Sequence, residues 1–110
     1  MADAGGAGER ASVILDELVA TIAARKRERP AGSYTTKLLD EGVDRIGRKI
    51  GEEAAEVIIA AKNASADELA WEVADLWYHS LVLLAAVDVD PDLVWAQLRS
   101  RHGHHGGRKE

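Results

Sequence analysis

The sequence has no cysteine, only two prolines and no excess of basic residues. The lack of cysteine excludes a disulfide framework, a thiol nucleophile and zinc sites built on thiolates. The net charge of −5 argues against a general nucleic-acid binder, which usually has a basic surface. No apolar run approaches the roughly 20 residues that span a bilayer, and the first residues lack the basic start and the apolar stretch of a signal peptide. We therefore expect a cytoplasmic protein that binds neither nucleic acid nor a membrane.

A chain of 110 residues with 46% hydrophobic content is expected to form one domain with a modest core. We expect this domain over residues 11–101, between a disordered N-terminal tail (1–10) and a disordered, His- and Gly-rich C-terminal tail (102–110). So small a bundle leaves apolar helix faces uncovered, which predicts a homodimer or a higher homo-oligomer. At least one of Trp71, Trp77 and Trp95 is expected at a subunit contact, where large aromatics are favoured.

Helix boundaries are marked by the prolines and by capping residues. A first helix is expected from about Val13 to Glu28, before Pro30. Further helices are expected over 33–39, over 43–62, from the capping box at Ser65 through residue 87, and from Asp90-Pro91 onward. No segment alternates with period two for long enough to predict a strand. The expected fold is all-α, a bundle of four to five helices.

Two pairs of carboxylates, Glu53 with Glu56 and Glu72 with Asp75, carry the functional prediction. Residues three apart share a helix face, so each pair places two acids side by side. Glu53 and Glu72 also fall on the apolar stripes of their helices, where an ionised carboxylate without a partner costs several kcal/mol. A hard divalent cation would offset this cost, and all-oxygen ligands suit Mg²⁺, with Mn²⁺ as the alternative.

Other interpretations of these helices remain open. Arg48 and Lys49 lie beside the acids and offer buried ion pairs in place of a metal. His79, four residues after Asp75, is expected to be packed and hydrogen-bonded rather than a ligand. Gly47 and Gly51 share one helix face, which close packing of another helix and the approach of a ligand explain equally well.

Three motifs resemble a known family. They are Ser33-Tyr34-Thr35-x-Lys37-Leu38-Leu39, Lys49-Ile50-Gly51-Glu52-Glu53-Ala54-Ala55-Glu56 with Lys62-Asn63, and Glu72-x-Ala74-Asp75-Leu76-x-Tyr78-His79. Together they resemble the phosphoribosyl-ATP pyrophosphatase (HisE) family, within the all-α, MazG-like nucleoside triphosphate pyrophosphohydrolases. The resemblance covers residues 13–101, and only Gly47 departs from the family pattern.

The resemblance implies Mg²⁺-dependent hydrolysis of 1-(5-phosphoribosyl)-ATP to 1-(5-phosphoribosyl)-AMP and pyrophosphate, the second step of histidine biosynthesis. It implies that the metal is held by Glu53, Glu56, Glu72 and Asp75. Glu52, beside these ligands, is either the base that activates water or an outer, surface acid. A house-cleaning MazG-like pyrophosphatase and a non-catalytic helical interaction module with paired acids remain the alternatives.

Substrate contacts are predicted in the polar segment that precedes the acids and at nearby lysines. The predicted contacts are Ser33, Tyr34, Thr35, Lys37, Lys49 and Lys62. Hydroxyls and a ring suit the nucleoside, and the ammonium groups suit its phosphates. The competing interpretation is that Ser33 only caps a short helix, that Tyr34 packs against the core and that the lysines are solvated surface.

Overall fold

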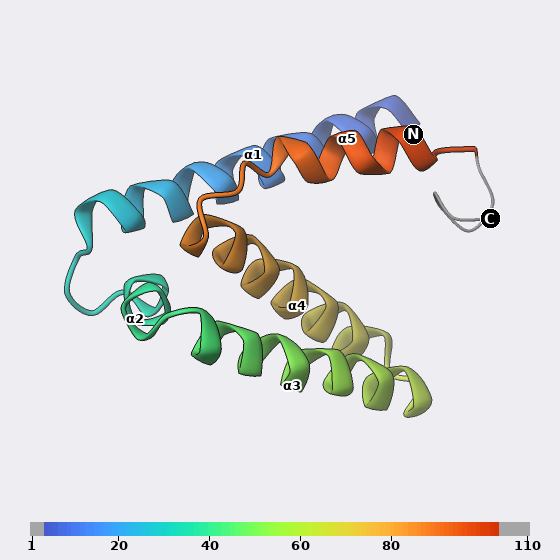
Figure 1. Cartoon of the computed structure of the whole chain (residues 1–110). Helices are drawn as coiled ribbons and strands as arrows, with labels where there is room; N and C mark the ends of the chain where they lie inside the picture. The colour runs from blue at the N-terminus through green and yellow to red at the C-terminus, as the bar shows by residue number, and fades with distance from the viewer. Residues whose placement is uncertain (1–3, 104–110) are drawn as a thin grey trace.

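The computed structural model describes residues 4–103, with side chains from Arg10 onward. It contains α1 (Ala4–Glu28), α2 (Tyr34–Glu41), α3 (Val43–Lys62), α4 (Ala66–Ala86) and α5 (Asp92–Arg101), and this part of the chain has no strand. The antiparallel pair α3 and α4 forms one layer, and α1 lies across the end of α4 that is remote from the turn joining the two (Figure 1). The predicted all-α fold is confirmed.

The capping residues set the helix boundaries as their chemistry predicts. The Ser33 hydroxyl accepts from the Thr36 amide at 3.1 Å, and the Ser65 hydroxyl accepts from the Glu68 amide at 3.2 Å. These bonds satisfy amides that would have no partner at the start of α2 and α4. Gly42 joins α2 to α3 with φ of 94°, a conformation that suits glycine. The turn therefore leads directly from α2 into the helix that carries Glu53.

The first and last helices begin at other residues than predicted. α1 begins at Ala4, earlier than the predicted start near Val13. No proline interrupts residues 4–10, where two alanines favour helix and three glycines oppose it. α5 starts at Asp92, one residue later than predicted, because Pro91 is its N-cap. The predicted tail at 104–110 lies outside the described residues.

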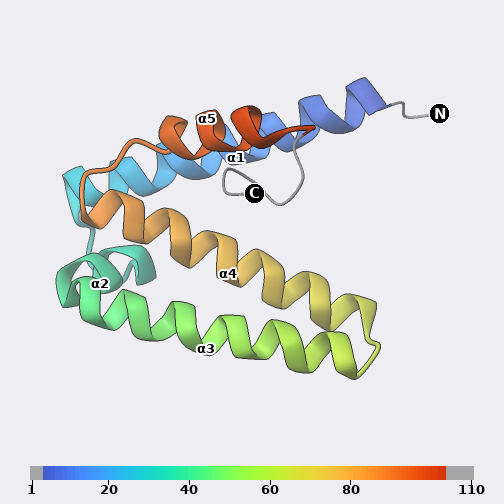
Figure 2. The ribbon, with the colours of Figure 1, turned by 45° about the vertical axis from the view of Figure 1, so that its right-hand side comes forward.

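The hydrophobic core ties four helices together at one end of the α3–α4 pair. Its buried members are Ile22, Leu38, Leu39, Ile46, Leu81 and Val82. Full burial of one such side chain contributes roughly 1.5–3 kcal/mol. The core therefore holds α2 firmly against the start of α3 and the second half of α4, as the turned view shows (Figure 2).

Polar contacts close the same end of the molecule. The Lys26 ammonium donates to the Ala85 carbonyl at 2.6 Å and pairs with Asp88 at 2.5 Å, which ties the end of α1 to the end of α4. Arg29 pairs with Asp40 and joins the α1–α2 connection to α2. These contacts add to the packing at the end of the bundle that lies next to the acids.

Within residues 4–103, every helix is too short or too polar to cross a membrane.

Candidate metal and substrate site

Three of the four predicted acids converge between α3 and α4. Carboxylate oxygens of Glu53, Glu72 and Asp75 lie within 4.8 Å of one another. Glu53 is only 7% exposed, because it follows Ile46 and precedes Ala60 at steps of seven on the buried stripe of α3. Glu72 and Asp75 are half-buried on α4. The stripe argument made from the sequence is confirmed for Glu53, and three hard oxygen donors at this spacing suit a divalent cation.

The fourth acid, Glu56, is not part of this group. It is exposed one turn further along α3, and its charge still acts on Glu72. A hydrogen bond with Glu53, partial burial and the charges of Glu53, Glu56 and Asp75 together raise the pKa of Glu72 above its ordinary value. The neighbouring acids therefore disfavour the ionised form of Glu72, and a bound cation would reverse that effect.

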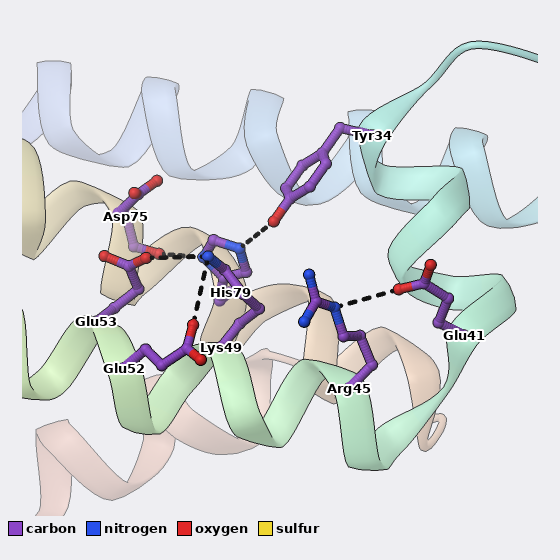
Figure 3. A network of polar contacts seen from close by, with 8 residues as sticks. All are labelled: Tyr34, Glu41, Arg45, Lys49, Glu52, Glu53, Asp75 and His79. Atoms are coloured by element: carbon purple, nitrogen blue, oxygen red, sulfur yellow. Dashed lines mark hydrogen bonds and ion pairs between the residues drawn. The ribbon is translucent and has the colours of Figure 1, made fainter.

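Lys49 is the cation that the protein itself places beside the acids. Its ammonium lies 3.4 Å from Glu53 and 3.7 Å from Glu52 (Figure 3). Burial opposes its charged form, but Tyr34 and the carboxylates of Glu53 and Glu52 outweigh burial and raise the pKa of Lys49. Lys49 neutralises one charge at most.

The ion-pair alternative accounts for only part of the acidic group. Arg45 pairs with Glu41 at 3.2 Å instead of with the acids, as Figure 3 shows. Among the described residues no ion pair reaches Glu56, Glu72 or Asp75. Three acids thus have no internal cation, which favours a metal over buried ion pairs.

His79 connects the acid-bearing helix to α2. It is 2% exposed, and its Nδ1 donates to the Asp75 carbonyl at 2.8 Å. In the neutral imidazole the other nitrogen then accepts, so the Tyr34 hydroxyl donates to Nε2 at 3.0 Å (Figure 3). His79 is packed and hydrogen-bonded, as predicted, and it positions Tyr34 beside the acids.

The predicted substrate residues are not all brought to one place. Tyr34 is 47% exposed and lies at the site, and Lys37 is exposed one turn later on α2. Ser33 caps α2, and Thr35 is buried with its hydroxyl bonded to the Tyr78 hydroxyl. Both hydroxyls thus have partners within the protein.

Two further predicted features differ from the expected arrangement. Lys62 lies nine residues after Glu53, about two and a half turns, and so on the opposite side of α3. Within the described residues the structure does not bring Lys62 to the acids. Gly47 and Gly51 have open space where a Cβ would be, so close packing of another helix of this chain does not explain them.

A pocket that the sequence does not predict lies beside the acids. Its volume is about 390 Å³, and Glu56 and Glu72 line it together with Glu68 and Trp71. A second cavity of about 570 Å³, between α1 and the end of α4, holds none of the predicted site residues. The spacing of residues on α4 indicates this pocket wall. Steps of three, one and three place four side chains on one helix face: Glu68, Trp71, Glu72 and Asp75.

Comparison with known proteins identifies relatives over most of the chain. The chain is 54% identical over 93 residues to the phosphoribosyl-ATP pyrophosphatase of Trichlorobacter lovleyi, covering 84% of this chain and 86% of that protein. It is 45% identical over 93 residues to the phosphoribosyl-ATP pyrophosphatase of Geobacter metallireducens, covering 84% and 85%. It is 55% identical over 97 residues to the histidine biosynthesis bifunctional protein HisIE of Halalkalibacterium halodurans, covering 88% of this chain but 46% of that protein.

The family assignment covers the same region as these relatives. Residues 15–102 match the family described as phosphoribosyl-ATP pyrophosphohydrolase, from within α1 to the end of α5. The matched span contains all the acids of the site, so the resemblance drawn from the sequence motifs is confirmed. The chain belongs to the phosphoribosyl-ATP pyrophosphohydrolase family.

Proposed function

We propose that this chain hydrolyses 1-(5-phosphoribosyl)-ATP between the α and β phosphates, giving 1-(5-phosphoribosyl)-AMP and pyrophosphate. One P–O bond of the anhydride breaks, and water supplies the new oxygen and releases a proton. The observation that supports this most strongly is the group formed by Glu53, Glu72 and Asp75 in a chain of this family. Within the described part of the chain, the protein supplies too few cations to neutralise these three carboxylates. The names of its relatives give the substrate and the pathway.

Glu53, Glu72 and Asp75 would hold Mg²⁺ in this proposal, and Glu56 would approach from the next turn of α3. Mn²⁺ would suit the same donors. A cation held here would polarise a phosphoryl oxygen and lower the pKa of the attacking water. Glu52 is exposed beside Glu53 and would accept the proton of the attacking water.

Two lysines on the side of the acids nearest α2, Lys49 and Lys37, would hold the phosphates. Lys49 lies next to Glu53 and keeps its positive charge because its pKa is raised. Lys37 is exposed one turn after Tyr34, on the helix that His79 fixes beside the acids. Ammonium groups at these positions neutralise the β and γ phosphates and so favour departure of pyrophosphate.

A substrate panel tests the proposal. Turnover of 1-(5-phosphoribosyl)-ATP is measured as pyrophosphate release with MgCl₂, beside ATP, dUTP and dCTP. We expect strong preference for the phosphoribosyl adduct and no turnover in EDTA. Equal turnover of the ordinary nucleotides would instead identify a house-cleaning pyrophosphatase. Absence of turnover, with no heat in a calorimetric titration of Mg²⁺, would identify a non-catalytic module.

We also propose that the active form is a homodimer, joined through an uncharged face of the α3–α4 pair that lies beside the acids. By helix geometry every position on that face is uncharged. On α3 these positions are Val43, Gly47, Ile50, Gly51, Ala54, Val57, Ile58 and Ala61, and on α4 they are Leu69, Val73, Leu76, Trp77, Ser80, Leu83 and Leu84.

Exposure of large side chains on this face supports the same arrangement. Trp77 is 58% exposed, and Ile58 and Val43 are exposed as well. Gly47 and Gly51 leave open space on the same side of α3, which would let a helix of a second copy approach closely. Uncharged surface of this extent on a small domain marks an association site.

A further inference from the structure

The pocket beside the acids lies along the path that a bound nucleotide would follow. Glu56 and Glu72 line it, and Glu72 also belongs to the metal-binding group, so the two sites are continuous. Its volume of about 390 Å³ falls in the range of small-molecule pockets. Ile59 and Asn63 line it from the last turns of α3, one to two turns beyond Glu56. A group attached to the phosphates on the side of the α3–α4 turn would therefore reach this pocket when the phosphates lie at the acids.

An indole forms one wall of the pocket. Trp71 is 71% exposed, although it is among the largest apolar side chains of the chain, and Ile59 beside it is also exposed. The face of an indole stacks on a nucleobase and attracts a cation held above it. Asn63 adds amide groups that both donate and accept hydrogen bonds. The wall is thus suited to a flat aromatic ring.

The charge of the pocket restricts which ring it binds. Its charged lining residues are all acids, with Asp67 and Glu68 in the first turn of α4 and Glu56 and Glu72 nearer the metal group. Acids in the first turn of a helix interact favourably with the helix dipole, which accounts for the position of these two. Their charge still faces the pocket. Among the described residues neither Asp67 nor Glu68 has an ion-pair partner. Such a pocket repels phosphate and favours a cationic ring.

The proposed substrate carries such a ring. An adenine substituted at N1 carries no proton on that nitrogen that it could release to become neutral. The ring and its exocyclic nitrogen therefore share a positive charge. Adenine in ATP is neutral. We propose that Trp71, with Asp67 and Glu68, binds the cationic, N1-substituted adenine and thereby distinguishes the phosphoribosyl adduct from ATP. This rests on the proposed function, because it takes the substrate from there.

Two mononucleotides that differ by one methyl group at N1, and therefore in ring charge, test the proposal. Dissociation constants of 1-methyl-AMP and AMP are measured by calorimetry for the full chain in MgCl₂. An exposed cation–π contact changes affinity by about two- to fivefold, so we expect wild type to prefer 1-methyl-AMP by at least this factor. Trp71→Leu and Glu68→Gln should each reduce the preference by about two- to fivefold, whereas Trp71→Phe should retain most of it. Glu17→Gln, an exposed charge removed from α1, is the matched control and should retain all of it.

The outcomes separate the two proposals. Equal affinity of wild type for both nucleotides, or an unchanged preference in Trp71→Leu and Glu68→Gln, overturns the assignment of the pocket. Hydrolysis of 1-(5-phosphoribosyl)-ATP by wild type is measured independently, and its absence overturns the proposed function instead. Since Trp71 and Glu68 are exposed, unchanged thermal melts should accompany the loss of preference.

Discussion

Replacing Asp75 with asparagine tests directly whether the acids hold a cation. Its carboxylate lies within 4.8 Å of the carboxylates of Glu53 and Glu72, and among the described residues no ion pair compensates it. The bond to His79 is made by the Asp75 backbone carbonyl, so the substitution leaves it in place. An amide at this position keeps the shape of the side chain, removes its charge and replaces one acceptor oxygen by an NH₂ donor. Any change in stability then reports the repulsion within the group.

The magnitude follows from Coulomb's law. Two unit charges 4.8 Å apart repel by about 1 kcal/mol in a water-like medium and by about 3.5 kcal/mol at an effective dielectric constant near 20. Asp75 is half-buried and partly screened, so the lower figure applies to each of its two neighbours, Glu53 and Glu72. Metal-free Asp75→Asn should therefore be more stable than wild type by about 2 kcal/mol, a rise in Tm of about 8–16 °C.

Mg²⁺ should reverse this order. A cation at a hundred times its Kd stabilises the folded wild type by about 2.7 kcal/mol. The variant has lost one of three clustered ligands and should gain little of this. Thermal melts followed by circular dichroism, at pH 7 and constant ionic strength, should place the variant above wild type in EDTA and below it in excess MgCl₂. Turnover of the variant should be abolished.

The matched control is Asp16→Asn, which removes an exposed acid from α1, a helix that carries none of the predicted site residues. It should shift neither melt and leave turnover unchanged. If Asp75→Asn melts below wild type in EDTA, the acids do not repel one another as the geometry requires. If Mg²⁺ raises the Tm of variant and wild type equally, Asp75 is not a ligand.

Three further predictions address other parts of the molecule. Because the pKa of Glu72 is raised, its contribution to metal-free stability is fully present below its ordinary pKa of 4.5 and is lost as pH rises through the raised pKa. Urea titrations over this pH range should show a smaller loss of stability in Glu72→Gln than in wild type, and equal losses would contradict the prediction. Lys37→Ala should lower kcat/KM about ten- to a hundredfold, since a hydrogen bond to a charged group is worth about 1.5–3 kcal/mol; an effect below about threefold, with an unchanged melt, would return Lys37 to the solvated surface. Light scattering should give twice the 11.9 kDa mass of one chain for wild type and a monomer for Trp77→Glu, and a wild-type monomer at micromolar concentration would refute the dimer.

The features that the sequence predicts well depend on near neighbours along the chain. α3 spans Val43–Lys62 as predicted, because Gly42 before it and Asn63 after it mark its ends. Burial of Glu53 follows from its place on a stripe of steps three and four, which is a property of one helix. The start of α1 was misplaced because the first residues combine alanine, which favours helix, with glycine, which opposes it.

The features that it predicts poorly depend on residues far apart in the chain. The Thr35 hydroxyl bonds to the hydroxyl of Tyr78, 43 positions away, and no local pattern indicates that contact. Tyr34 meets His79 at a separation of 45 positions, and no local pattern indicates that bond. The pocket at Trp71 likewise needs α3 and α4 in register before its walls meet. Tertiary pairing decides each of these cases.

The register of α3 against α4 also gives the site a direction. Lys49 lies at the end near α2, whereas Asp67 and Glu68 lie at the opposite end near the α3–α4 turn. Bound with its terminal phosphates toward Lys49, the proposed substrate places its cationic ring among the acids. Bound in reverse, it would place pyrophosphate against Asp67 and Glu68 and leave the ring beside an ammonium, so both ends would repel it. The opposite charges of the two ends therefore select one orientation, the one that presents the α–β anhydride to Glu53, Glu72 and Asp75.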